Sequence, residues 1–308
     1  MKPILFGPIT SRRFGTSLGI DLSPNIKQCN FDCLYCELEG KRAIEKMEDI
    51  ISVDSILQAL QNTSLDSIDV LTITANGEPT LYPHLYELIQ KIKTIIPQKT
   101  KTLILSNGSR FGESCVQKAL LLFDKVKFSL DGGNQKIFSR IDRPHKNLML
   151  QNITEGIRNF SKIYQGELFA EILFIKNIND KQENLDNLIN FFKDLKLARI
   201  DLSTIDRPPA YTTTPLSFEE LELIAKFLQK ELPHIPISIP KRKAPLQDAQ
   251  YLEKEELFNL IARRPIEATE AQKIFTKDTL SHLTALLNEK RIFLQKVDQL
   301  FFYTTKNI

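Results

Sequence analysis

Three cysteines stand close together near the N-terminus of the chain. They lie at positions 29, 33 and 36, so that Cys29, Cys33 and Cys36 have the spacing C-x₃-C-x₂-C. Spacings this short let one loop wrap three sulfurs around a single metal centre. A four-iron cluster normally takes four thiolates, so three thiolates leave one iron with an open and reactive position. The spacing predicts a four-iron, four-sulfur cluster that takes part in chemistry.

Two other interpretations of these cysteines are open. A closed zinc site needs four ligands, and the fourth would have to come from a distant residue such as Cys115 or His84. Alternatively the cysteines are incidental core residues, which the polar neighbours Asn30, Asp32 and Glu37 disfavour. Cys115 stands alone on a predicted helix, and we expect it to be a small core residue.

The elements that must position the cysteines alternate along residues 18–207. Six short, mostly apolar runs read as strands buried on both faces: Leu18–Leu22, Val70–Thr74, Thr102–Leu105, Lys125–Leu130, Phe169–Ile175 and Arg199–Thr204. Patterns with helical spacing lie between them: Val53–Gln61, Leu85–Ile95, Gly112–Leu121, Leu148–Ile163 and Glu183–Leu195. This alternation predicts an α/β fold, a partial (β/α)₆ barrel of parallel strands joined by right-handed crossovers. In such folds the site lies at the carboxyl ends of the strands.

Polar or glycine-bearing segments directly follow five of these strands, which favours a pocket shared by one edge of the sheet. The segments are 76–79, 106–108, 131–133, 176–177 and 206–209. Four basic residues past strand ends are candidates for gripping a phosphate or carboxylate of the substrate: Arg143, His145, Lys176 and Arg207. Ordinary ion pairing with surface carboxylates is the alternative for each of them.

The last fifty residues read as a separate unit. Four prolines between positions 233 and 245 interrupt any regular pattern and indicate a connector. We therefore divide the chain into a barrel domain, 1–240, a linker, 241–254, and a C-terminal domain, 255–308. The C-terminal domain shows helical patterns at Glu255–Arg263, Thr269–Phe275 (capped by Thr269) and Thr279–Asn288, then strands Arg291–Val297 and Leu300–Thr304 around a turn at 298–299. Three helices followed by a hairpin is the order of a winged helix-turn-helix.

Composition limits the class of protein without naming its partner. The 308 residues carry a net charge of +3. Residues 1–240 hold 29 basic and 29 acidic side chains, and residues 241–308 hold 12 and 9, so the excess lies at the C-terminal end. This permits a polyanionic partner and does not require one. No apolar run approaches the roughly 18 residues of a membrane span or forms a signal peptide. We expect a cytoplasmic protein that does not enter membranes.

The cysteine motif, with an aromatic residue just before its last cysteine, resembles the radical S-adenosylmethionine superfamily. The resemblance implies that Cys29, Cys33 and Cys36 hold the cluster and that its open iron binds the amino and carboxylate groups of S-adenosylmethionine. It implies reductive cleavage of that cofactor to a 5′-deoxyadenosyl radical, with electrons from a donor such as flavodoxin or ferredoxin. It also implies cofactor contacts at Tyr35, Asn76, Gly77, Glu78, Asn107, Ser129 and Asp131. According to the resemblance, Glu78 binds the ammonium group of the cofactor, Tyr35 packs near its adenine, and Ser129 and Asp131 bind its ribose.

Other segments resemble a group of small proteins related to the wyosine-forming enzyme of tRNA. They are Gly7-Pro8, Ser11-Arg12-Arg13, Arg143-Pro144-His145 and Asp206-Arg207-Pro208-Pro209, together with the C-terminal winged helix. The wyosine enzyme uses a second set of three cysteines, whereas only Cys115 remains here. The resemblance therefore indicates the class of enzyme but not its substrate. If the winged helix binds the substrate, that substrate is RNA or a protein.

Two functions follow from these observations. The first is an enzyme that cleaves S-adenosylmethionine and abstracts hydrogen from a substrate. The second is an iron–sulfur sensor that binds nucleic acid through its winged helix. A DNA-reading helix is usually rich in Arg, Lys, Asn or Gln, but 279–288 offers only His282 and Asn288. The sequence favours the enzyme.

Overall fold

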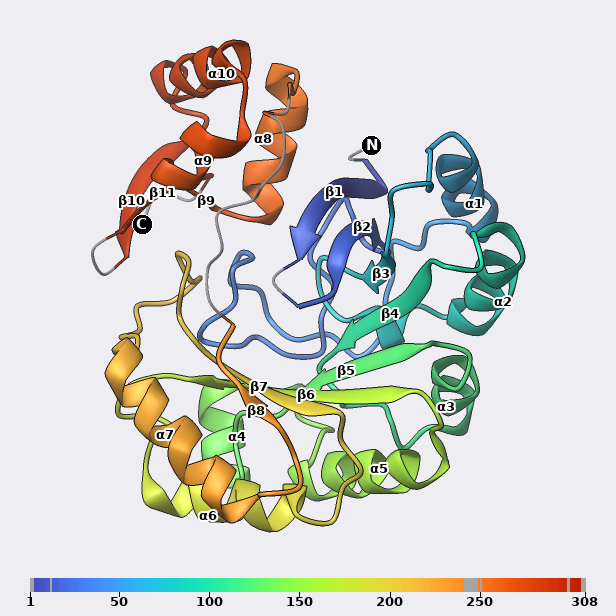
Figure 1. Ribbon diagram of the computed structural model, residues 1–308, viewed down its shortest axis with the longest axis vertical. Helices are drawn as coiled ribbons and strands as arrows, with labels where there is room; N and C mark the ends of the chain where they lie inside the picture. The colour runs from blue at the N-terminus through green and yellow to red at the C-terminus, as the bar shows by residue number, and fades with distance from the viewer. Residues whose placement is uncertain (1–2, 12, 241–248, 250, 298–299, 306–308) are drawn as a thin grey trace.

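A sheet of eight strands in chain order forms the larger part of the molecule. The computed structural model describes residues 3–11, 13–240, 249, 251–297 and 300–305. Strand β1 is antiparallel to β2, and β2 to β8 are parallel to one another. The strands are β1 Leu5–Ser11, β2 Gly15–Asp21, β3 Val70–Thr74, β4 Lys101–Ser106, β5 Lys125–Ser129, β6 Glu167–Phe174, β7 Arg199–Thr204 and β8 Ile237–Ser238. The sheet is strongly curved (Figure 1).

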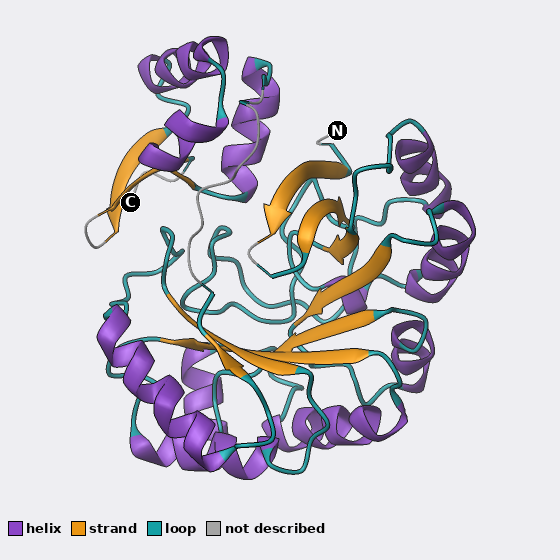
Figure 2. Cartoon of the chain, viewed as in Figure 1, coloured by secondary structure: helices purple, strands orange, loops and turns teal. Residues whose placement is uncertain are grey.

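Helices cover the outside of the curve, and loops occupy its inner side (Figure 2). The helices are α1 Val53–Gln61, α2 Leu85–Ile95, α3 Ser114–Leu120, α4 Gln135–Ile141, α5 Leu150–Ile163, α6 Gln182–Phe192 and α7 Phe218–Glu231, with a 3₁₀ turn, η1, at Pro79–Leu81. Their apolar sides pack on the sheet in one continuous core. None of the described helices is long and apolar enough to cross a membrane.

The six predicted strands correspond to β2–β7, and the predicted α/β class is confirmed. Two strands of this sheet were missed. The edge strand β1 contains Gly7-Pro8, where its pairing with β2 is irregular. Because proline is rare inside strands, this segment was not predicted to be one. The other edge strand, β8, has only two residues and follows Pro236. The resulting sheet has eight strands, where six were expected.

The C-terminal elements form a second group with a core of its own, drawn in orange to red in Figure 1. They are α8 Lys254–Arg263, β9 Ile266–Glu267, α9 Ala268–Ile274, α10 Lys277–Asn288, β10 Phe293–Val297 and β11 Leu300–Thr304. The three strands make an antiparallel sheet in the order β10-β11-β9. The expected cap at Thr269 is wrong, because α9 begins one residue earlier, after Glu267. Most of the predicted linker 241–254, the turn at 298–299 and Arg12 lie outside the described residues.

The end of β10 reaches the larger part of the molecule. Val297 packs against a small apolar cluster that contains Ile175 and Ile205, which follow β6 and β7. Tyr35 of the cysteine loop packs against the same cluster. The C-terminal group therefore touches the loops at the carboxyl edge of the main sheet.

Candidate functional site

The three cysteines lie in the long loop between β2 and α1, and all three thiols are free. They line a pocket of about 240 Å³ together with residues of β3, β4, β5 and β6 and of the segments that follow β3 and β4. The lining residues are Lys27, Cys29, Phe31, Cys33, Tyr35, Cys36, Leu38, Thr74, Gly77, Glu78, Leu105, Ser106, Asn107, Lys127, Ser129 and Glu171. The carboxyl edge of the sheet therefore brings the cysteines close to most of the predicted cofactor residues.

A short parallel bridge between Gln28 and Gly77 fixes the start of the cysteine loop. Gln28 N–H donates to Asn76 O at 2.8 Å, and Glu78 N–H donates to Gln28 O at 3.0 Å. Gly77 has φ +145°, and a Cβ built there would lie 1.8 Å from Gln28 O. Only glycine permits this approach. Asn76 acts here through its backbone and is not among the pocket-lining residues.

Glu78 is buried at the base of the pocket and binds the loop after β4. Its Oε1 accepts hydrogen bonds from Thr80 N, Thr80 Oγ1 and Ser106 Oγ at 2.6–2.9 Å. Its Oε2 accepts one from Asn107 N at 2.7 Å. Burial raises the pKa of Glu78, and these hydrogen bonds oppose the shift. A carboxylate oxygen accepts more than one hydrogen bond, so Oε2 has capacity for a cationic group.

Asn107 connects this carboxylate to the cysteine loop. Its Nδ2 donates to Asn30 Oδ1 at 2.7 Å, and Asn30 Nδ2 in turn donates to Ser109 Oγ at 2.8 Å. Asn107 therefore orders the loop around Cys29 as well as lining the pocket. The sequence placed Asn107 at this edge but gave no sign of its link to Asn30.

Two of the three thiols, Cys29 and Cys33, hold their protons more strongly in the metal-free site than an ordinary thiol does. Burial, with the nearby charge of Glu78, raises the pKa of Cys29 to about 12. Burial, with the charge of Asp142, raises the pKa of Cys33 well above its usual value. Iron binds thiolates, so filling the site must release these protons.

Lys27 places a positive charge beside the cysteines, which favours their thiolate forms. It is buried, and its Nζ donates to Glu39 O at 2.7 Å. Burial alone would lower the pKa of Lys27, but negative charge at Cys36, Cys29 and Asp32 outweighs that effect and raises it. Its position two residues before Cys29 is a sequence signal that could have placed Lys27 at the site, and it was not recognised.

Tyr35 and Asp131 form a buried hydrogen bond at the side of the pocket. Tyr35 Oη donates to Asp131 Oδ2 at 2.5 Å, and Asp131 Oδ1 accepts from Leu173 N at 2.6 Å. Burial raises the pKa of Asp131 to about 7, and it raises that of Asp142, which faces both Asp131 and Cys33. Asp131 supports Tyr35 here and is not among the pocket-lining residues, whereas Ser129 is. Their ribose roles stay predictions.

Charged side chains of β5, β6 and β7 extend the site into the barrel, and sequence analysis missed them. Lys127 Nζ lies 2.8 Å from Glu171 and 3.2 Å from Asp201. Arg13 pairs with both carboxylates, and Arg199 pairs with Asp201 at 2.7 Å. Burial would raise the pKa of Glu171, but Lys127 and Arg13 lower it to about 2. A charged residue at an alternate position of an apolar strand is the signal that marks Lys127 and Glu171.

The four basic candidates for substrate binding separate into two pairs. Arg143 and His145 line a second cleft, beside the cysteine loop. Lys176 pairs with Glu220 at 2.7 Å, and Arg207 donates to Glu37 at 2.7 Å. The structure thus favours the ion-pair alternative for Lys176 and Arg207, and Arg143 is also paired, with Asp32 at 3.0 Å.

Neither distant residue considered as a fourth zinc ligand lines the cysteine pocket. His84 precedes α2 and lies 3.9 Å from Glu87, and Cys115 is exposed on α3 near Glu113. The expectation that Cys115 belongs to the core is therefore wrong. Among the described residues, no group of three His, Cys, Asp or Glu side chains is placed to hold a single metal ion.

Three free thiols and a buried carboxylate lie at the carboxyl edge of the curled parallel sheet. This arrangement defines a class of α/β proteins that hold an iron–sulfur cluster beside a small-molecule cofactor. The chain belongs to the Radical SAM superfamily, whose profile matches residues 26–189. A UPF0026 protein of Helicobacter pylori (strain 26695) is 50% identical over 307 residues, covering 98% of this chain and 97% of that protein. UPF0026 protein MJ1312 of Methanocaldococcus jannaschii is 30% identical over 322 residues, covering 99% and 96%.

Solved structures share the fold at low sequence identity. TYW1 with a lysine-pyruvate adduct bound matches with a TM-score of 0.51 and 18% identity, over 70% of this chain and 74% of that one. Streptococcus suis SuiB bound to precursor peptide SuiA matches with a TM-score of 0.58 and 13% identity, over 75% and 50%. These likenesses concern the fold alone.

The cofactors of this superfamily are a four-iron, four-sulfur cluster and S-adenosylmethionine, and the expectation from the cysteine motif is confirmed at that level. The site fits them. Three free thiols share one pocket, as a thiolate-held cluster requires, and a buried lysine lies beside them. Glu78 lines the same pocket and has an oxygen that can accept a further hydrogen bond.

Proposed function

We propose that the protein is an enzyme that cleaves S-adenosylmethionine reductively and abstracts hydrogen from a substrate. When bound, the cluster supplies the electron that splits the cofactor into methionine and a 5′-deoxyadenosyl radical. Cys29, Cys33 and Cys36 would hold three irons, Lys27 would offset thiolate charge, and Glu78 would orient the cofactor's ammonium. The observation that carries the proposal is the shared pocket of the three free thiols and Glu78.

Anaerobic incubation of the reconstituted protein with S-adenosylmethionine and dithionite tests this function. We expect 5′-deoxyadenosine, measured by chromatography and mass spectrometry, in amounts that exceed a cluster-free control. A reconstituted protein that contains the full complement of iron and sulfide but forms no 5′-deoxyadenosine contradicts the proposal.

Replacing Glu78 by glutamine is expected to weaken cofactor binding. A hydrogen bond to a charged group contributes roughly 1.5–3 kcal/mol, which corresponds to a loss of affinity of about tenfold or more. Titration calorimetry with S-adenosylmethionine on the reconstituted protein measures it, with iron content as a check that the cluster remains. Glu87→Gln, on the exposed side of α2, is the control. Unchanged affinity in Glu78→Gln removes this residue from the cofactor site.

We further propose that the C-terminal group, the elements α8 to β11, is a winged helix that positions an RNA or protein substrate at the barrel. Its order of helices and strands and the packing of Val297 on the loops after β6 and β7 support this placement. The sensor alternative has weaker support. His282, one of the two base-reading candidates, is hydrogen-bonded through Nδ1 to Leu252 O at 3.0 Å.

Deleting residues 246–308 is expected to preserve the cluster and uncoupled 5′-deoxyadenosine formation. Turnover of the true substrate should fall, since positioning is lost while the reacting groups remain. Iron assays and product analysis of the truncated protein measure both effects. A truncated protein that cannot hold the cluster shows instead that this group is part of the catalytic core.

The free thiols also support a reducing, cytoplasmic location, in which cysteines stay reduced. A low-potential flavodoxin or ferredoxin would be the source of electrons there.

A further inference from the structure

A second cleft, of about 440 Å³, lies against the cysteine loop and shares no lining residue with the cofactor pocket. It is lined by Asp32, Gly40, Lys41, Arg42, Ala43, Arg143, Pro144, His145, Lys146 and Tyr211. Asp32 lines this cleft, whereas its neighbours Phe31 and Cys33 line the cofactor pocket. The loop that carries the cysteines is therefore the wall between the two spaces.

The charge of this cleft is strongly positive. Five of its lining residues are basic and one, Asp32, is acidic. Asp32 is already engaged by Arg143 Nη2 at 3.0 Å and by Tyr211 Oη at 2.7 Å. In the part of the chain that the structure describes, Lys41, Arg42 and Lys146 have no ion-pair partner. Their charge remains available to an acidic group from outside.

The wall of the cleft is built to hold this arrangement. Arg143 has φ +45°, an uncommon conformation for a residue with a side chain. Its guanidinium lies 4.3 Å from the centre of the Tyr211 ring. Tyr211 packs directly on Gly40, where a Cβ would lie 2.7 Å from the Tyr211 Oη. Asp32, Arg143 and Tyr211 thus form one fixed unit on the outer side of the cysteine loop.

We propose that this cleft docks an acidic electron-transfer protein, an inference that rests on the proposed function. A substrate that meets the cofactor-derived radical must enter the cofactor pocket, and the cysteine loop separates that pocket from the cleft. What the reaction needs from the other side of the loop is an electron. One electron passes from the reduced flavin or iron–sulfur centre of the partner to the cluster. The partner centre is oxidised by one electron, the cluster is reduced by one electron, and no atoms are exchanged. The positive cleft attracts and orients a partner with a negative surface.

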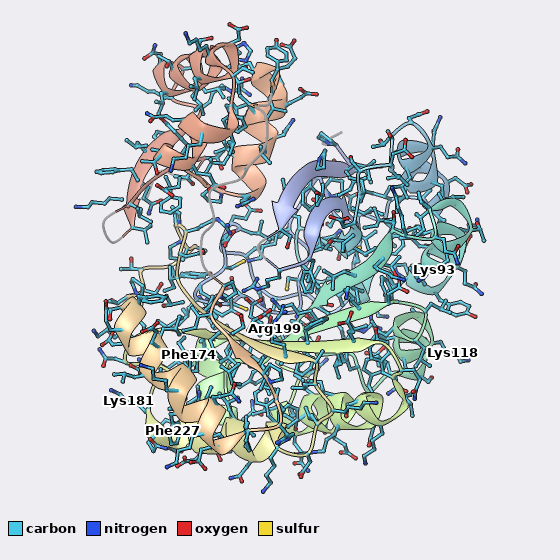
Figure 3. The ribbon with its side chains drawn as sticks, in the orientation of Figure 1. Lys93, Lys118, Phe174, Lys181, Arg199 and Phe227 are labelled. Carbon is cyan, nitrogen blue, oxygen red and sulfur yellow. The ribbon has the colours of Figure 1, made fainter. Side chains whose placement is uncertain are left out.

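Charge reversal at the rim of the cleft tests this proposal in the full-length, reconstituted protein. The variant is Arg42→Glu with Lys146→Glu, both exposed. Lys118→Glu with Lys226→Glu is the matched control on helices α3 and α7, with Lys118 at the outer edge of the helical layer (Figure 3). Stopped-flow bleaching of the cluster is measured with reduced acidic flavodoxin, at low and high salt, and separately with reduced methyl viologen.

We expect the flavodoxin-driven rate of the cleft variant to fall by about tenfold or more at low salt. The difference from wild type should shrink at high salt, because salt screens exposed charges. The control pair should react as wild type, and reduction by viologen should not be slower in any variant. The double variant Arg42→Gln with Lys146→Gln, which removes the two charges without reversing them, should give an intermediate rate. This neutral variant tests the proposal if the charge-reversed protein does not fold.

A wild-type flavodoxin rate in either cleft variant overturns the proposal. The same holds if the cleft variant loses binding of an RNA oligonucleotide while its reduction by flavodoxin is normal, since the cleft is then a nucleic-acid surface. Failure of the proposed function gives a different result: the viologen-reduced wild type would form no 5′-deoxyadenosine, whatever the flavodoxin rates.

Discussion

Replacing Cys29, Cys33 and Cys36 together by alanine is expected to give a folded protein that holds neither iron nor sulfide and forms no 5′-deoxyadenosine. The three thiols lie in one pocket, and a cluster held by three protein ligands cannot survive the loss of all of them. Iron and sulfide assays after anaerobic reconstitution, with circular dichroism to verify folding, measure the effect.

Cys115→Ala is the matched control, because that thiol is exposed on α3 and lies outside the pocket. It should bind as much iron and sulfide as wild type. A triple variant that retains both elements would show that the cluster, or another metal centre, is held elsewhere.

Gly77→Ala is expected to have the second large effect. The new Cβ would lie 1.8 Å from Gln28 O, in a backbone conformation that side chains rarely adopt. Strain of roughly 1–3 kcal/mol and overpacking of roughly 1–3 kcal/mol together lower the free energy of unfolding by about 2–6 kcal/mol. Since the bridge to Gln28 leads directly into Cys29, iron content after reconstitution should fall as well.

Denaturant unfolding of the metal-free protein measures the loss of stability. Gly112→Ala is the control, because a Cβ there would meet only the Cα of Gly156 at an ordinary 3.5 Å. If Gly77→Ala unfolds like Gly112→Ala, the close approach to Gln28 does not constrain this loop.

The strands at the centre of the sheet could be predicted because each is a short apolar run between polar segments. Edge strands lack that pattern: β1 contains Gly7-Pro8, and β8 has two residues. Helix α7 was also overlooked, although Ser217 and Glu220 form the capping box that marks its start. In that case the signal was present in the sequence.

The candidate site divides in the same way. Residues that directly follow a strand, such as Glu78 and Asn107, are gathered by the topology of a parallel sheet, so their proximity to the cysteines could be foreseen. Contacts between side chains that are far apart in the sequence could not be predicted. Arg207 meets Glu37, 170 residues away, and nothing in the local sequence distinguishes that contact from a free guanidinium.

The order of the strands also bears on how the protein is made on the ribosome. Each of β2 to β7 pairs only with the strands before and after it in the chain, so no pairing waits for a distant segment. Nascent chains emerge N-terminus first and fold in that direction. By the time Tyr211 has been synthesised, the three cysteines have been made together with the residues that hold their loop, from Glu78 and Asn107 to Asp131 and Arg143. The cysteine loop can therefore reach its place on the sheet, ready for metal delivery, while the C-terminal group is still untranslated.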